Sequence, residues 1–88
     1  MTNAPNDLRE MWADAYRLFD INYKMPNTDE AWKRFWEQAQ SLLNKTSDEN
    51  NRFLFRMINM VAEMIEDRMK IEMGILPRKF SLEDMKLF

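Results

Sequence analysis

The most constraining feature of this 88-residue chain is a long stretch without a helix breaker. Residues 47–73 contain neither glycine nor proline, and Gly74, the chain's one glycine, follows directly. Because a left-handed glycine commonly ends a helix, the stretch predicts a single helix of about 27 residues, ~40 Å long. Thr46 and Glu49 have the spacing of a capping box at its start.

Two shorter helices are expected before it. Apolar residues recur at helical spacing over residues 7–24, and Pro26 ends this pattern because a helical residue before proline is disfavoured. Residues 27–44 form a second such pattern, with cap oxygens at Asn27 and Thr28. Each helix is ~27 Å long at 1.5 Å per residue. The expected apolar faces comprise Leu8, Met11, Trp12, Ala15, Leu18, Phe19 and Tyr23 in the first helix, and Trp32, Phe35, Ala39, Leu42 and Leu43 in the second.

These patterns predict an all-α fold. One valine, three threonines and one glycine leave little material for sheets and tight turns. We expect residues 1–88 to form one domain, a three-helix bundle with a long third helix and a short helical or extended C-terminal tail over residues 75–88.

The third helix is apolar over roughly 220° of its circumference, which is more than one neighbouring helix covers. Leu54, Ile58, Val61 and Ile65 hold the middle of this arc. Two shorter helices reach only along the first half of a longer one, so the last turns should remain uncovered. The apolar residues expected there are Ile65, Met69, Ile71 and Met73. One side of the arc carries Phe53, Met57, Met60, Met64 and Ile71, and the other carries Phe55, Ala62, Met69 and Met73.

The tail is too apolar for a typical disordered segment, since seven of its residues are large and hydrophobic. In one interpretation it folds back over the exposed end of the third helix. In the other, the tail and the end of the helix form a contact surface that binds another protein. A second copy of the chain is preferred to a different protein as this partner. The candidate partner-binding residues are Met69, Ile71, Met73, Ile75, Leu76, Phe80, Met85 and Phe88.

Composition argues against catalysis and cofactor binding. The chain has no cysteine and no histidine, which removes thiolate nucleophiles, the usual general base and the commonest metal ligands. Glu63, Glu66 and Asp67 are best interpreted as a solvated helix face. We therefore expect no enzyme activity, no cofactor and no metal. The N-terminus lacks the basic and apolar regions of a signal peptide, and no segment is long enough to span a membrane, which predicts a cytoplasmic protein.

Two functions remain open. The first is a non-enzymatic protein–protein interaction module, either a homodimer or an adaptor or inhibitor of a larger protein. The alternative is a small DNA-binding regulator, for which Arg52 and Arg56 offer the best contacts. A net charge of -2, and six acidic against four basic residues in the third helix, make nucleic acid the weaker choice.

The pattern of the chain also resembles a group of known proteins. Residues 12–18, the Asp29-Glu30-Ala31-Trp32 segment and the long third helix are similar to small uncharacterised helical accessory proteins of bacterial phages and integrative elements. The resemblance covers about residues 8–67. It implies an accessory role in a mobile element and carries no catalytic motif.

Overall fold

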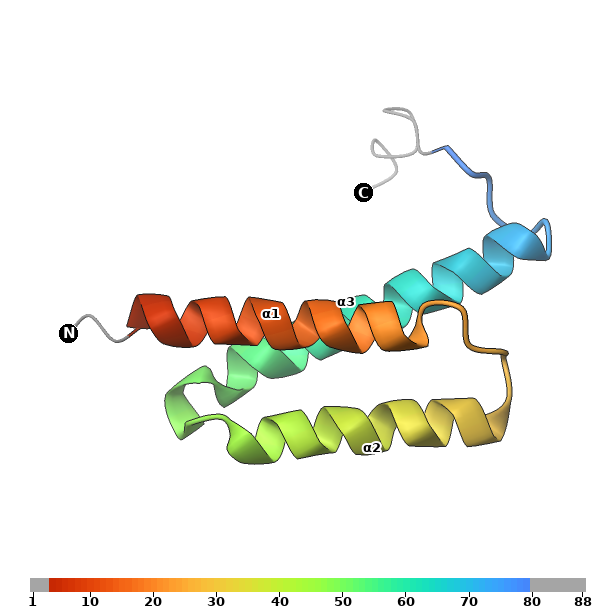
Figure 1. The fold of residues 1–88 in the computed structure, drawn as a ribbon. Helices are drawn as coiled ribbons and strands as arrows, with labels where there is room; N and C mark the ends of the chain where they lie inside the picture. The colour runs from red at the N-terminus through yellow and green to blue at the C-terminus, as the bar shows by residue number, and fades with distance from the viewer. Residues whose placement is uncertain (1–3, 80–88) are drawn as a thin grey trace.

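The computed structural model describes residues 4–79, which form three α-helices (Figure 1). Helix α1 spans Ala4–Asn22, α2 spans Asp29–Lys45 and α3 spans Asp48–Glu72. No strand occurs within the described residues. The all-α prediction with a long third helix is confirmed, although α1 begins three residues before the predicted boundary and α2 two residues after it.

The three helices alternate in direction. In Figure 1, α1 and α3 run the same way, and α2 returns between them in the chain and runs the opposite way. The most extensive contact is between the parallel helices α1 and α3. Each therefore leaves one flank for α2 and the opposite flank without a helical neighbour in the described chain.

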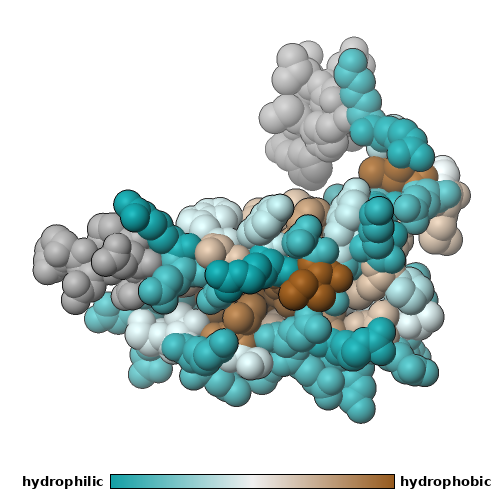
Figure 2. Space-filling view, viewed as in Figure 1, coloured by the Kyte–Doolittle hydropathy of each residue, from teal (hydrophilic) through white to brown (hydrophobic). Residues whose placement is uncertain are grey.

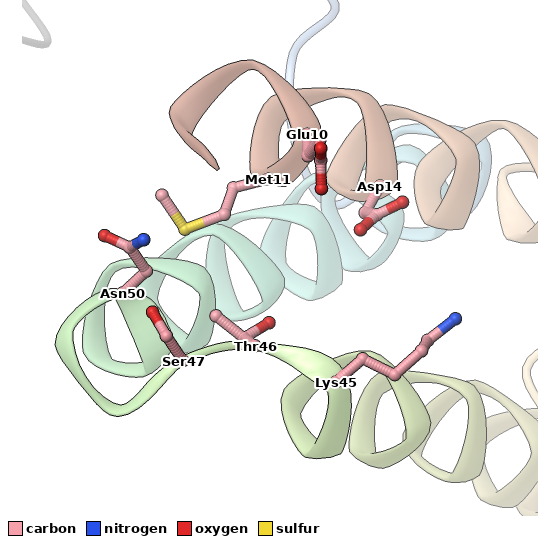
Figure 3. Close-up of a pocket in the computed structure, with 7 residues that line it drawn as sticks. All are labelled: Glu10, Met11, Asp14, Lys45, Thr46, Ser47 and Asn50. Atoms are coloured by element: carbon pink, nitrogen blue, oxygen red, sulfur yellow. The ribbon is translucent and has the colours of Figure 1, made fainter. Parts of the chain in front are cut away.

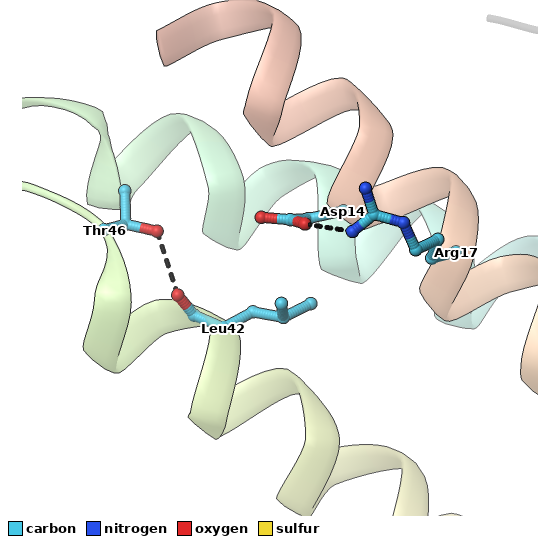
Figure 4. A network of polar contacts seen from close by, with 4 residues as sticks. All are labelled: Asp14, Arg17, Leu42 and Thr46. Atoms are coloured by element: carbon cyan, nitrogen blue, oxygen red, sulfur yellow. Dashed lines mark hydrogen bonds and ion pairs between the residues drawn. The ribbon is translucent and has the colours of Figure 1, made fainter.

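Residues 28 and 46, both threonine, have different roles at the ends of α2. Thr28 is the N-cap, and its hydroxyl oxygen accepts a hydrogen bond of 3.2 Å from the Ala31 amide, as expected for a helix start. The Thr46 hydroxyl instead donates to the Leu42 carbonyl over 2.9 Å (Figure 4). The predicted capping box at Thr46 is therefore wrong, because the last turn of α2 leaves unpaired carbonyls that take its hydroxyl first. Ser47 occupies the N-cap of α3 without a side-chain cap bond.

Gly74 ends the long helix as predicted. Its φ of 79° lies in the left-handed region, where a side chain would be strained. The Gly74 amide donates to the Ile71 carbonyl at 3.0 Å, and the Ile75 amide donates to the Lys70 carbonyl at 2.8 Å. These two bonds form the Schellman arrangement, which satisfies the last carbonyls of α3 and turns the chain away from the helix axis.

The core lies where the three helices meet. The middle of the apolar arc of α3 is buried as predicted, and the largest fully buried side chain, Phe35, comes from α2. The buried polar residue Asn22 connects α1 with α2. Its Nδ2 donates to the Leu18 carbonyl of α1 and to Gln38 Oε1 of α2, both over 2.8 Å. The buried apolar residues are Met11, Ala15, Leu18, Met25, Ala31, Phe35, Ala39, Leu54, Ile58, Val61, Ala62, Ile65 and Met69.

The far end of α3 is better covered than the length difference predicts. Ile65 is fully buried and Met69 is only 7% exposed, so the expectation that they remain uncovered is wrong. Helix α1 is about 28 Å long and α3 is about 38 Å long. Because the two helices are parallel, α1 covers most of the length of α3. Met25, in the connection after α1, is buried as well. The uncovered end shrinks to Met73 and Ile75.

Candidate protein-binding surface

A row of aromatic side chains on α1 faces outward. Trp12 is 56% exposed and Tyr16 is 67% exposed, and Tyr23, one residue beyond the helix, is also exposed. The sequence pattern placed Trp12 and Tyr23 on the buried face, and this assignment is wrong. The buried stripe of α1 is narrower than its apolar stripe, because α1 packs chiefly on α3 and α2 covers only its other flank.

A second exposed row lies along α3. Phe53 is 55% exposed and Met60 is 40% exposed, and Met64 is exposed to a similar degree. Met57 and Ile71, on the same side of the helix, are half-buried. The arc of α3 is therefore uncovered along this side from Phe53 to Met64, and Phe55, on its other side, is exposed as well, whereas the sequence predicted an uncovered end.

These two rows lie next to each other. A pocket of about 280 Å³ is lined by Tyr23 from the first row and by Met64 and Ile71 from the second. The other flank of α1 faces α2, across a groove lined by Leu18, Ile21 and Leu42 among others. We call the two rows together the aromatic–methionine face, which consists of Trp12, Tyr16, Tyr23, Phe53, Met60 and Met64.

The surface that Figure 2 shows is a different one. It shows the side on which α1 and α2 lie next to each other, where polar residues predominate and apolar atoms gather along the junction of the two helices. A further group of apolar atoms is visible at the end of α3, where the chain leaves the helix.

Arg68 holds the base of the aromatic–methionine face in place. Its side chain is only 14% exposed, and Nη2 donates to the Met25 carbonyl over 2.7 Å. Nη1 lies 3.4 Å from a carboxylate oxygen of Glu72, four residues further along α3. The guanidinium carbon lies 5.8 Å from the centre of the Tyr23 ring, within cation–π range. One arginine thus ties the α1–α2 connection to α3 at the point where Tyr23 meets it.

We expect Arg68→Met to destabilise the protein by about 1–3 kcal/mol, because the Met25 carbonyl loses a charged donor. Glu72→Ala is the matched control, since it removes only the exposed partner of Arg68 and should cost about 0–1 kcal/mol. Urea unfolding followed by circular dichroism measures both. A larger loss in Glu72→Ala than in Arg68→Met would contradict this role of Arg68.

The partner-binding residues predicted at the end of α3 do not form one exposed surface in the described part of the chain. Met69 belongs to the core. Ile71 and Leu76 are half-buried, and Ile71 lines the pocket beside Tyr23. Met73 and Ile75 are exposed. The three remaining residues, which lie outside the described part of the chain, are Phe80, Met85 and Phe88.

Another pocket lies at the opposite end of the bundle, near the start of α1 (Figure 3). Its volume is about 440 Å³, but its lining is mainly polar, unlike the apolar lining usual for small-molecule sites. Asp14 in this lining is paired with Arg17 at 2.8 Å, and the Thr46 hydroxyl is bonded to Leu42 (Figure 4). Two of the polar groups that line this pocket are therefore already bonded within the protein. The lining residues are Glu10, Met11, Asp14, Lys45, Thr46, Ser47 and Asn50.

Residues 4–79 also lack two other kinds of site. In this part of the chain, no three acidic, histidine or cysteine side chains are grouped so that they could hold a metal ion. None of the described helices combines the length and apolar character needed to cross a membrane.

Comparisons with known proteins give no relative. No family model, no curated protein and no solved structure matches this chain.

Proposed function

We propose that this protein is a non-enzymatic protein–protein interaction module that binds through the aromatic–methionine face. The observation that carries this proposal is the exposure of six large apolar side chains in two adjacent rows. Single exposed apolar residues are ordinary, but soluble monomers rarely expose a large contiguous apolar patch without using it.

The chemistry of the face supports a protein as its ligand. Tryptophan, tyrosine, phenylalanine and methionine are enriched in protein interfaces relative to other surfaces. Aromatic rings bring large contact areas with few rotatable bonds, and methionine adapts its shape to the partner. The face is open and elongated, which suits another helix better than a small molecule.

No specific observation in the structure favours either the DNA-binding alternative or the accessory role in a mobile element. Arg52 and Arg56 are exposed, but acidic side chains precede and follow them on α3, so we do not propose the DNA-binding alternative. An accessory role in a mobile element, which the sequence resemblance implies, would be one setting for an interaction module and stays part of the proposal.

Removing two side chains of the face tests the proposed function. We expect the double variant Trp12→Ser/Met60→Ser to lose the complexes that the unaltered chain forms, whether with itself in light scattering or with a protein captured from a lysate of the source cells. The double variant Ile21→Ser/Trp36→Ser is the control, because it removes two apolar side chains elsewhere on the surface that are at least as exposed as Met60. Equal behaviour of the two variants would contradict the assignment of the face.

A further inference from the structure

The side of α3 that borders the aromatic–methionine face carries an ordered row of charges. When α3 is projected at about 100° per residue, six charged residues fall on the same side of the helix. This side is opposite the buried residues and adjacent to Met60. All six are exposed, and none forms an ion pair with another described residue. We call this row the charged edge, and in chain order it consists of Glu49, Arg52, Arg56, Glu63, Asp67 and Lys70.

The charged edge is antisymmetric about the middle of α3. Its signs run negative, positive, positive up to Asn59, and negative, negative, positive after Met60. A twofold axis between these two residues would therefore place every charge of the edge opposite its complement in an antiparallel copy. The three pairings are Glu49 with Lys70, Arg52 with Asp67, and Arg56 with Glu63, each across the two copies.

Within one chain, two pairs of like charges in this row are unfavourable. Arg52 and Arg56 are four residues apart, as are Glu63 and Asp67, and like charges at this spacing repel on a helix. Neither pair is neutralised by an ion pair in the described chain. An opposing copy with the reverse order of charges would relieve both repulsions at once.

The same axis also matches the apolar residues. It brings Met60 next to Met60 of the second copy, and Met57 next to Met64 of the second copy. An apolar row flanked by complementary charges is the arrangement by which paired helices set orientation and partner choice. Trp12 and Tyr16 of α1 lie along the other side of this row and would widen the contact.

We propose that the aromatic–methionine face and the charged edge bind a second copy of this chain, with the two α3 helices antiparallel about an axis between Asn59 and Met60. The proposal rests on the proposed function and names its partner. From Glu49 to Lys70 the contact is about 32 Å long, and with α1 it is about two helix diameters wide. This offers about 600 Å² per copy, the lower end of what stable interfaces bury. Since each copy uses the same surface, the contact closes into a dimer.

Charge reversal tests both partner and orientation. Arg56→Glu alone places two glutamates opposite each other on both sides of the axis, and Glu63→Arg alone places two arginines there. We expect each variant to dissociate at least tenfold more readily than the unaltered chain in sedimentation equilibrium at low salt. Mixed in equal amounts, the two variants should restore a dimer. On one side of the axis the introduced glutamate then faces the introduced arginine, and on the other side the unaltered Glu63 faces the unaltered Arg56.

A remote charge reversal is the control for the mixture. Arg34 is exposed on α2, away from the charged edge, so Arg34→Glu should dimerise like the unaltered chain. Fluorescently labelled Glu63→Arg should form a dimer more tightly with Arg56→Glu than with Arg34→Glu, because both central pairings are complementary in the first mixture and only one is in the second. This difference supports the antiparallel pairing and excludes a general attraction between oppositely altered chains.

Three results would overturn the proposal. They are a monomeric unaltered chain at several hundred micromolar, single variants that dimerise undiminished, and a labelled variant that stays monomeric with Arg56→Glu. The proposed function is tested separately, because a monomeric chain that still loses a different protein partner in Trp12→Ser/Met60→Ser would keep the interaction module and discard the second copy.

Discussion

Val61→Asp should abolish cooperative thermal unfolding and leave a largely unfolded chain at 25 °C. Val61 is almost fully buried at the centre of the core, one turn from both Ile58 and Ile65. An aspartate there is a buried charge without a partner, and its cost is comparable to the ~5–15 kcal/mol by which small domains are stable. Far-ultraviolet circular dichroism during a temperature scan measures the effect.

The neighbouring residue provides the control for Val61→Asp. Met60→Asp introduces the same side chain one position along the helix, where the surface is exposed. It should keep the helical signal at 25 °C, even if it weakens association through the aromatic–methionine face. Cooperative melting of Val61→Asp near the temperature of the unaltered chain would mean that α3 is rotated relative to the described structure.

Phe35→Ala should lower the free energy of unfolding by about 3–5 kcal/mol. Phe35 is the largest fully buried side chain, and its ring packs edge-on against Trp32 and Trp36 at centroid distances of 5.5 and 4.9 Å. Truncation leaves a cavity between α2 and the other helices that the surrounding side chains fill only partly. Urea unfolding with circular dichroism detection gives the change.

Trp36→Ala is the matched control for this truncation. It removes an even larger ring from the adjacent position, but this ring lies largely at the surface and shares only one edge contact with Phe35. The expected loss is the ~0.5–1.5 kcal/mol of an aromatic pair plus a modest burial contribution. Losses of equal size in the two variants would contradict the central position of Phe35 in the core.

The helices themselves follow closely from local sequence signals. Thr28 and Gly74 begin or end helices by bonds within a single turn, so their roles are visible in the sequence. Thr46 shows the limit of this reasoning. Its position satisfies the requirements of two adjacent helix ends, and the structure shows that the hydroxyl bonds to the end of α2.

The candidate surface was only partly predictable. The exposed Met73 and Ile75 follow from the greater length of α3, and the pairing of Arg68 with Glu72 follows from their spacing. The exposure of Trp12 and Phe53 does not, because helical periodicity shows which residues share a face and does not show how wide a strip the neighbouring helix covers. A signal was present in Tyr16, an aromatic residue at the margin of the stripe of α1.

The sequence by itself determined three helices, their approximate ends and the line of α3 that is buried most deeply, because helix formation and its termination depend on residues within a few positions of one another. Tertiary structure alone decided that α1 packs chiefly on α3, that Met25 and Arg68 close the far end of the bundle, and that the flank of the arc with Phe53, Met60 and Met64 stays exposed. These features depend on how helices of unequal length, with apolar faces of unequal width, pack together. Such contacts join residues that are far apart in the chain.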